Sequence, residues 1–232
     1  MKTIGVLGGL GPQATMDFEV RLHHVAQQLI PHKANSGYPP MVVYYFREAP
    51  VVMPADGSMP TTLPPANPRL LDASRWLGTC ADFLVITSNG VHVWQEEIEQ
   101  AAGRKVLSMI DAVVDEVKRR RLRRVGIVDF RPPNLGLYPP MLDRLGVAWE
   151  VLSPDLTKAL AVSVFAVDEG RLDSKVTQPA LDALDYIRAR HVDGIILACT
   201  EIPLMLGDWL DAPDIINPAQ LLAESAVRHA MA

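Results

Sequence analysis

The chain has 232 residues, of which 49% are hydrophobic and 21% charged, and its formal net charge is −5. This length is enough to bury a substantial core in one large or two small domains. The acidic balance argues against a nucleic-acid-binding protein, which usually carries a basic excess. No apolar run reaches the roughly 18 residues of a membrane-spanning helix. Two cysteines and no signal-peptide pattern predict free thiols and a cytoplasmic protein, with neither nucleic acid nor a membrane as a partner.

Short apolar strands alternate with amphipathic helices along the chain. The apolar run 4–7, a glycine-rich turn and the amphipathic stretch 13–29 form the opening strand, turn and helix. The same alternation predicts further strands at 41–46, 82–87, 106–109, 124–128, 148–152, 194–198 and 215–216. It predicts further helices at 68–79, 91–101, 111–121, 174–190, 201–210 and 218–229. Such a pattern is typical of an α/β protein whose parallel sheets are covered by helices on both faces.

Two stretches differ in composition from the rest. Residues 49–68 are rich in Pro, Gly, Ser and Thr and directly follow a predicted strand, where α/β proteins place functional loops. They are interpreted as a lid or entrance loop, or as a plain surface excursion. The basic run 118–124 is interpreted as the solvated end of a helix leading into a strand, in preference to a phosphate-binding patch.

A weak internal repeat relates residues 81–89 to residues 192–200. In each segment an aspartate, Asp82 or Asp193, precedes an apolar strand that ends in a small polar or thiol residue before a helix begins. Two such corners could face each other across a pseudo-two-fold axis. Two buried strands of one α/β protein also look this similar by chance fairly often.

Cys199 is the foremost candidate for chemistry. It ends a predicted strand and precedes a helix that carries Thr200 and Glu201. A helix N-terminus favours the thiolate and lowers a cysteine pKa, and a thiolate there can act as a base or a nucleophile. The alternative is a small buried hydrophobic residue, a common role of free cysteine. Cys80 precedes a strand, at the other end of the sheet, and is interpreted as a core or structural residue.

Ser88, Asn89 and Gly90 form the matching corner after another predicted strand. Ser88 could bond a substrate oxygen, and Asn89 could donate to a carboxylate. Gly90 and the start of the next helix could supply backbone N–H groups for an anion. An ordinary capped turn is the alternative, because Ser and Asn are favoured N-cap residues.

The glycine-rich turn at 8–12 matches neither the dinucleotide-binding fingerprint nor the phosphate-binding lysine loop. Gly9, Leu10 and Gly11 are instead expected to let the backbone approach a small anionic ligand. No group of His, Cys, Asp and Glu has the sequence spacing of metal ligands, so we expect no metal.

These residues carry a resemblance to the aspartate/glutamate racemase superfamily, especially to aspartate racemases, that runs nearly from end to end. It rests on an opening strand and loop (2–15), a first active-site segment (81–92), a second active-site segment (198–202) and the sheet-closing pair Asn217-Pro218. The resemblance implies two similar α/β domains, 1–110 with 217–232 and 111–216, with the active site in the cleft between them, and a homodimer.

The resemblance also implies chemistry without a cofactor. In such enzymes one thiolate removes the α-proton of an amino acid and an opposite thiol returns a proton on the other face. Because that α-proton is very weakly acidic, the site must bind carboxylates, exclude water and stabilise a developing enediolate with fixed donors. Here Ser88 stands where the first catalytic cysteine is expected, and Gly90 where a threonine is expected. A one-thiol mechanism with Cys199 as the base or acid therefore fits better than symmetric two-base racemisation.

The chain departs from the family in a second region. Residues 129–134 replace a Gly-Thr substrate-binding segment, and the lysine expected near Asp168 is missing. Asp168 and Asp129 would add negative charge where an acidic substrate needs positive partners. Arg47 and Arg131 could compensate as a relocated carboxylate clamp, because arginine binds carboxylates bidentately.

The leading hypothesis is a cofactor-independent amino-acid racemase or isomerase acting on a small carboxylate, expected to be acidic. Cys199 is the thiol and Ser88 a weak second group. The expected ligands of carboxylate or enediolate oxygens and of the rest of the substrate are Gly9, Leu10, Gly11, Arg47, Asn89, Gly90, Arg131, Thr200 and Glu201. Two alternatives stay open: a one-cysteine decarboxylase-type lyase whose apolar pocket would use Trp94 and Phe130, and a racemase-like binding protein without activity.

Overall fold

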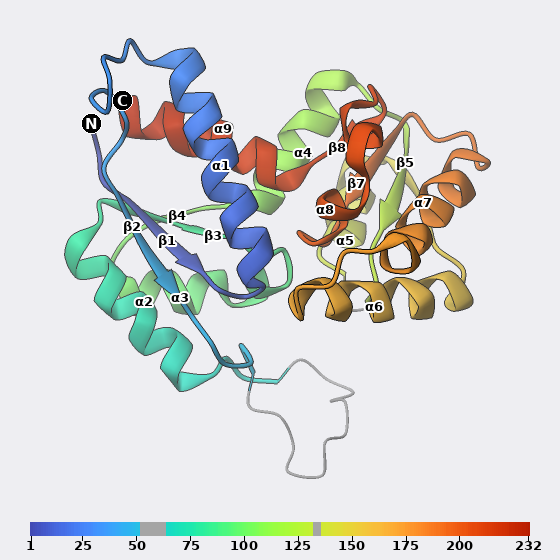
Figure 1. Ribbon diagram of the computed structural model, residues 1–232, viewed down its shortest axis with the longest axis horizontal. Coiled ribbons are helices and arrows are strands. Elements are labelled where there is room, and N and C mark those ends of the chain that lie inside the picture. Colours follow the sequence, from blue (N-terminus) through green and yellow to red (C-terminus); the bar gives the residue numbers. More distant parts are fainter. Residues whose placement is uncertain (52–63, 132–135) are drawn as a thin grey trace. The chain divides into compact units, whose positions relative to one another are not determined.

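The computed structural model describes residues 1–51, 64–131 and 136–232. The chain divides into two compact units, Met1–Ser108 with Leu222–Ala232 and Met109–Leu221. Each unit contains a four-stranded parallel sheet flanked by helices (Figure 1). In the described ranges no helix is long and apolar enough to cross a membrane.

The first unit is built around the sheet order β2-β1-β3-β4. Its elements, in chain order, are β1 (Ile4–Gly8), α1 (Pro12–Leu29), β2 (Met41–Tyr45), α2 (Pro68–Cys80), β3 (Phe83–Ile86), the 3-10 helix η1 (Gly90–Trp94), α3 (Gln95–Ala102), β4 (Val106–Leu107) and most of α9 (Pro218–Met231).

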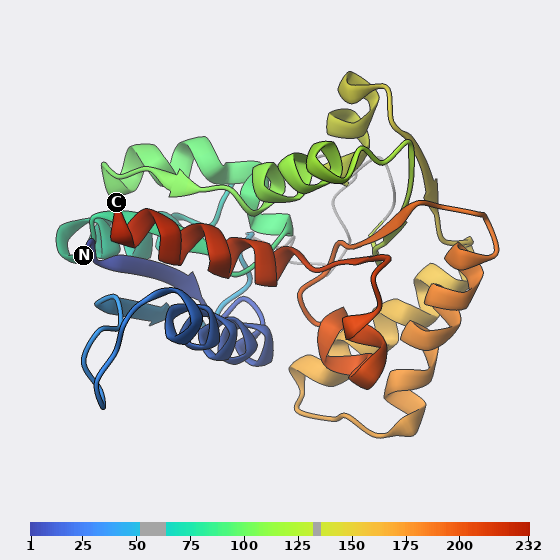
Figure 2. The ribbon, with the colours of Figure 1, turned by 90° about the horizontal axis from the view of Figure 1, so that it is seen from above.

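Helices cover both faces of this sheet, with α2 and α3 on one face and α1 and α9 on the other (Figure 1, Figure 2). Successive strand residues point to opposite faces. Leu84 accordingly packs in the core with α2 and α3, whereas the ring of Phe83 contacts His229 of α9. The helices α2 and α3 approach closely at Gly78, where a Cβ atom would lie 1.9 Å from the carbonyl oxygen of Ala102.

The second unit repeats this plan with the sheet order β6-β5-β7-β8. Its elements, in chain order, are α4 (Met109–Arg120), β5 (Arg124–Val128), α5 (Tyr138–Leu145), β6 (Ala148–Val151), α6 (Pro154–Asp168), α7 (Ser174–Arg188), β7 (Gly194–Leu197), α8 (Ile202–Met205), the 3-10 helix η3 (Gly207–Asp211) and β8 (Ile215–Ile216).

Two cores lie on the two faces of the second sheet. Ile195 and Leu197 of β7 pack with α6 and α7, and Ile196, between them, packs with α4 and α5. Strands buried on both faces are therefore apolar without a break. The residues of β7 are thus buried on both faces of the sheet up to its carboxyl end.

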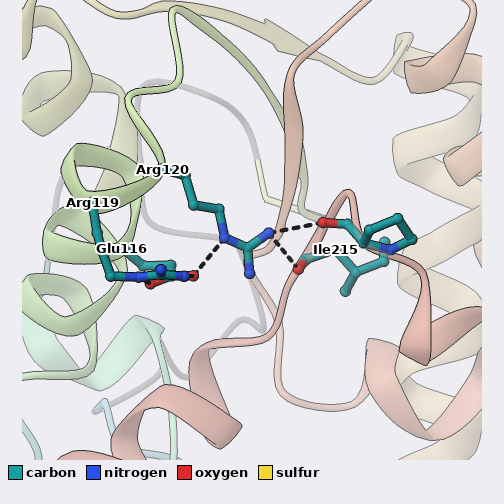
Figure 3. Close-up of polar contacts among 5 residues, drawn as sticks. Glu116, Arg119, Arg120 and Ile215 are labelled. Carbon is teal, nitrogen blue, oxygen red and sulfur yellow. Dashed lines mark hydrogen bonds and ion pairs between the residues drawn. The ribbon is translucent and has the colours of Figure 1, made fainter.

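The basic run lies at the end of α4 and the start of β5, as predicted. Figure 3 shows Glu116 accepting hydrogen bonds from the guanidinium groups of Arg119 and Arg120. Those bonds, that of Arg119 first, hold the pKa of Glu116 down at about 2. Arg120 also donates to the carbonyl oxygens of Pro213 and Ile215, at 2.9 and 3.4 Å. The run thus ties α4 to the entry of β8.

The alternation of strands and helices predicts both sheets correctly, and some of the helical regions differ from expectation. The helices α5 and α6 were not predicted. Both have proline in the first turn, where it is tolerated: Pro139 and Pro140 follow Tyr138 in α5, and Pro154 begins α6. The predicted helix 201–210 is instead α8 followed by η3, because the chain turns at Gly207 with a φ of 50°. Most of the predicted lid, residues 52–63, lies outside the described residues, as do residues 132–135.

Candidate active site

The carboxyl end of β7 places three buried polar residues in a row. The backbone N–H of Ala198 still donates to the carbonyl oxygen of Val128, 2.9 Å away, so the chain after β7 stays beside the end of β5. Cys199, Thr200 and Glu201 follow, with exposed fractions of 7, 5 and 4%. The second corner named by the sequence is therefore a buried cluster at the carboxyl edge of its sheet, where α/β proteins build their sites.

The thiol of Cys199 is paired with the carboxyl group of Glu201. Cys199 Sγ donates to Glu201 Oε2 at 2.8 Å, and the hydroxyl of Thr200 donates to the same oxygen at 3.3 Å. The other oxygen, Oε1, is buried and has no hydrogen-bond partner among the described residues. Glu201 is thus held against the thiol by one oxygen, while the second oxygen has capacity left for a ligand or a water molecule.

The expectation that a helix dipole lowers the pKa of Cys199 is wrong. Burial, followed by the charge of Glu201, raises the pKa of this thiol well above its ordinary value. The backbone N–H of Glu201 acts in the opposite direction but is outweighed. The helix α8 has only four residues, so its dipole is small beside a buried carboxylate. The resting group is a neutral thiol that donates a hydrogen bond.

Glu201 can change its protonation near neutral pH. Burial, followed by the negative charge of Asp168, raises its pKa to about 7. A carboxyl group with this pKa can accept a proton from the thiol and return it at physiological pH. The pair Cys199–Glu201 is therefore suited to proton transfer more than to anion binding.

Arg131 is held by Asp129 in a bidentate ion pair. Its Nε and Nη2 atoms lie 3.1 and 2.8 Å from the two carboxylate oxygens of Asp129. Nη2 also donates to the carbonyl oxygen of Ala198 at 3.2 Å, and the backbone N–H of Arg131 donates to Asp129 Oδ1. Both residues also line a cavity of about 20 Å³, which has room for about one water molecule. The guanidinium is fixed beside the Cys199 corner, but its bidentate edge is occupied by Asp129 and is not open to a substrate carboxylate.

In the first unit, two threonines shape the loop after β1. Gly9 and Gly11 have φ values of 79° and 120°, which residues with a side chain rarely adopt. Thr15 Oγ1 accepts from the N–H of Gly9 at 2.9 Å and donates to the carbonyl oxygen of Gly11 at 3.0 Å. The hydroxyl of Thr87, 2.8 Å away, then donates to Thr15. The predicted loop, with Leu10 half-buried between the glycines, is fixed against the end of β3.

The corner after β3 is uncharged. Ser88 is half-buried, Asn89 is buried and Gly90 begins η1. His92 Nδ1 donates to the carbonyl oxygen of Ser88 at 2.8 Å, and burial lowers the pKa of His92 to about 4, so the ring is neutral at neutral pH. This corner offers hydroxyl, amide and backbone groups, which suit binding and orienting of a ligand.

Arg47 follows β2 in the first unit and is exposed. Its guanidinium lies over the ring of Tyr45, 4.8 Å from the centroid, and it lines an open hollow of about 590 Å³ together with Arg69 and Trp76. Neither unit by itself brings Arg47 and Arg131 together, because they belong to different units. The two-arginine clamp stays a prediction.

Three further sequence interpretations concern Cys80, Trp94 and Phe130. Cys80 is exposed at the end of α2, so its assignment to the core is wrong, although it does lie at the amino end of β3. Trp94 is a core residue whose indole donates to the carbonyl oxygen of Pro64. Phe130 packs edge-on against the ring of Phe165. Trp94 and Phe130 lie in different units.

Sequence reasoning did not identify the pairing of Asp129 with Arg131 or the role of Thr87. The sequence had drawn attention to Asp129 only for its charge. Thr15, the partner of Thr87, belonged to the opening segment 2–15 but had no role of its own. One signal was available: an aspartate two residues before an arginine in a turn can accept both its backbone and its side-chain N–H groups. In the described ranges no group of three His, Cys, Asp or Glu residues is placed to hold a metal ion.

The two units share one plan: a four-stranded parallel sheet flanked by helices, with a polar corner after the third strand in sequence, so the chain has a two-unit α/β fold with a repeated architecture. The chain belongs to the Asp/Glu/Hydantoin racemase family, whose sequence profile matches residues 7–226.

One relative matches nearly the whole chain in sequence, and others match part of it or share its fold. The broad specificity amino-acid racemase RacX of Bacillus subtilis is 26% identical over 225 residues, covering 97% of this chain and 96% of that protein. A glutamate racemase from Syntrophus aciditrophicus is 31% identical over 153 residues, covering 62% of this chain and 54% of that protein. The aspartate racemase of Picrophilus torridus has the same fold, with a TM-score of 0.77 at 19% identity, covering 100% of this chain and 95% of that one.

Proposed function

We propose that the protein is a cofactor-independent amino-acid racemase or isomerase in which Cys199 exchanges the α-proton of the substrate. The observation that carries this proposal is the 2.8 Å contact between the Cys199 thiol and the Glu201 carboxyl group. Membership of the racemase family and the likeness to a broad specificity amino-acid racemase support the reaction class.

The first step activates the thiol. The Glu201 carboxylate accepts the proton of Cys199, which leaves a thiolate and a neutral carboxylic acid. Because the pKa of the buried thiol lies well above that of Glu201, this transfer is uphill, and the thiolate forms only transiently. Burial keeps the thiolate poorly solvated and therefore strongly basic towards a substrate proton.

The second step breaks the Cα–H bond. The thiolate takes the α-proton, an S–H bond forms again, and the electron pair passes into the carboxylate as an enediolate. In our proposal Thr200, Asn89, Gly90 and the loop 9–11 bind carboxylate or enediolate oxygens. Fixed hydrogen-bond donors of this kind contribute a large share of catalysis when charge develops on oxygen.

The third step returns a proton to the carbanion. Return from Cys199 restores the original configuration, and return from the other face inverts it. Ser88 is our candidate for the second group, because its hydroxyl can deliver a proton and be reprotonated by water. A hydroxyl is a far weaker acid and base than a thiol, so we expect α-proton exchange to be faster than inversion.

Exchange in deuterated water tests this proposal. The protein is incubated with a panel of L- and D-amino acids, and loss of the α-proton signal is followed by proton NMR. We expect exchange by the native chain and by Cys80→Ala, a matched control that removes the exposed thiol, and none by Cys199→Ala. An active, folded Cys199→Ala variant would refute the mechanism. Substituted malonates in the same panel test the lyase alternative, because that activity releases carbon dioxide.

Assembly is tested separately. The expectation of a homodimer rests on family resemblance, and light scattering of the purified chain measures it directly. A monomer would remove that expectation without affecting the assignment of Cys199.

A further inference from the structure

We propose that the Asp129–Arg131 ion pair makes the enzyme select amino acids with neutral or basic side chains and reject aspartate and glutamate. This inference rests on the proposed function, and it replaces the expectation of an acidic substrate. It concerns the side chain of the substrate, whereas the reaction at the α-carbon is unchanged.

The geometry shows that the side chain of Arg131 already forms a bidentate ion pair with Asp129. The bidentate edge of its guanidinium, formed by Nε and Nη2, faces the carboxylate of Asp129 at 3.1 and 2.8 Å. The side chains are 19 and 9% exposed, so little water competes with the pair. Bidentate pairing is the mode by which arginine recognises a carboxylate. A substrate carboxylate would have to displace Asp129, which is fixed by the backbone N–H of Arg131 as well.

The charges around Cys199 also disfavour an acidic side chain. The carboxyl groups of Asp129 and Glu201 both act electrostatically on Cys199, and Asp168 acts on Glu201. Arg131 contributes the positive charge that acts on Cys199 and is neutralised by Asp129. A second substrate carboxylate would therefore meet like charge without a free bidentate partner, which is an effective way to reject a ligand.

The same charges favour other amino acids. Every amino acid brings an ammonium group at the α-carbon, which carboxylates can accept, and lysine or arginine brings a second cation. A neutral side chain meets no repulsion. The α-carboxylate itself is assigned to the uncharged donors of the proposed site. The negative charges near Cys199 therefore do not oppose binding of the ammonium and carboxylate groups on the α-carbon.

Matched substrate pairs provide the first test. Aspartate and asparagine differ in charge but scarcely in shape, as do glutamate and glutamine. We expect the native chain to exchange the α-proton of each amide with a kcat/KM at least about a hundredfold higher than that of the corresponding acid, since like-charge contact typically costs this much or more. Alanine, leucine and lysine complete the panel.

A single substitution should shift this ratio. Asp129→Asn keeps an oxygen for the backbone N–H of Arg131 but removes the charge, which releases the guanidinium for a substrate carboxylate. We expect the ratio of kcat/KM for the acid to kcat/KM for the amide to rise at least about tenfold. This is the effect of one good charge-assisted hydrogen bond. Asp214→Asn is the matched control, because Asp214 pairs bidentately with Arg188 at the amino end of β8, away from the Cys199 edge. It should leave the ratio unchanged.

The outcomes separate this inference from the proposed function. Exchange that is faster with aspartate than with asparagine, or confined to acidic amino acids, would overturn the inference while supporting the racemase assignment. A folded Asp129→Asn variant with the native ratio would also overturn it. Absence of α-proton exchange with every amino acid would refute both the inference and the proposed function. If Asp129→Asn does not fold, as thermal unfolding will show, the matched pairs on the native chain decide alone.

Discussion

The corner after β3 and the corner after β7 occupy the same place in two sheets of the same strand order. Their frames are alike in detail. Asp82 Oδ2 accepts from the backbone N–H of Thr3 at the start of β1, and Asp193 Oδ2 accepts from Arg123 and Arg124 at the start of β5. The internal repeat seen in the sequence is therefore a structural one, in which each aspartate fastens its strand to the neighbour.

The chemistry of the two corners differs. The first offers a hydroxyl, an amide and a neutral histidine. The second offers a buried thiol, a carboxyl group with a pKa near 7 and an ion pair. The contrast teaches that the frame sets where a side chain lies, while the few residues after the strand decide whether the corner carries ionisable groups.

The largest difference is expected in catalysis. Glu201→Gln should lower kcat/KM for α-proton exchange by roughly a thousandfold, because the amide cannot accept the thiol proton. Ser88→Ala, in the other corner, should lower inversion roughly tenfold and leave exchange nearly unchanged, because Ser88 is proposed to act only on the opposite face of the substrate. In the native chain the rate should rise with pH through about 7, as Glu201 loses its proton. Loss of activity without loss of that pH step in Glu201→Gln would assign the step to another group.

The second difference concerns stability. Arg131→Met leaves the carboxylate of Asp129 buried without its partner and should lower the free energy of unfolding by about 3 kcal/mol. Thr15→Val, in the first unit, removes hydrogen bonds of neutral groups and should cost about 1 to 2 kcal/mol. Urea denaturation measures both. Equal losses would mean that the ion pair is better hydrated than its exposure indicates.

The third difference is the direction of the pH dependence of stability. The pKa of Glu201 is about 7, above its usual 4.5, so the folded state keeps a proton that the unfolded chain has lost, and stability falls as pH rises between those values. The pKa of His92 is about 4, below its usual 6.5, so stability rises over that range. Each effect is on the order of 3 kcal/mol.

These opposite slopes can be separated by substitution. Between about pH 4.5 and 6.5 the two contributions should nearly cancel in the native chain. Glu201→Gln should leave the rise due to His92, and His92→Asn should leave the fall due to Glu201. Thermal unfolding across this range reads both slopes, and the same profile in all three proteins would contradict the two assignments.

The smallest effect tests the likeness of the frames. Asp82→Ala and Asp193→Ala each remove exposed hydrogen bonds to a neighbouring strand and should each cost about 1 kcal/mol. Equal losses in urea denaturation would support equivalent roles. A clearly larger loss at one position would show that the two units depend on their aspartates to different degrees.

The sequence was sufficient for the parallel sheets and for the positions of both corners, because apolar strands and the residues after them follow a local pattern. It was insufficient for the protonation of Cys199, which depends on the burial of the corner and on the orientation of Glu201. It also could not reveal that Arg131 turns back onto Asp129. The protonation state of the residues at a corner depends on tertiary contacts, whereas the position of the corner follows from the local sequence pattern.

The exposed thiol of Cys80 has a practical consequence. It lies at the amino end of β3, whereas Cys199 is buried and hydrogen-bonded at the carboxyl end of β7. A maleimide dye or a nitroxide spin label will therefore attach selectively to Cys80 in the native chain. Cys80 therefore offers an attachment point for a spectroscopic probe in the first unit, and thiol titration of the folded chain reports Cys80 first.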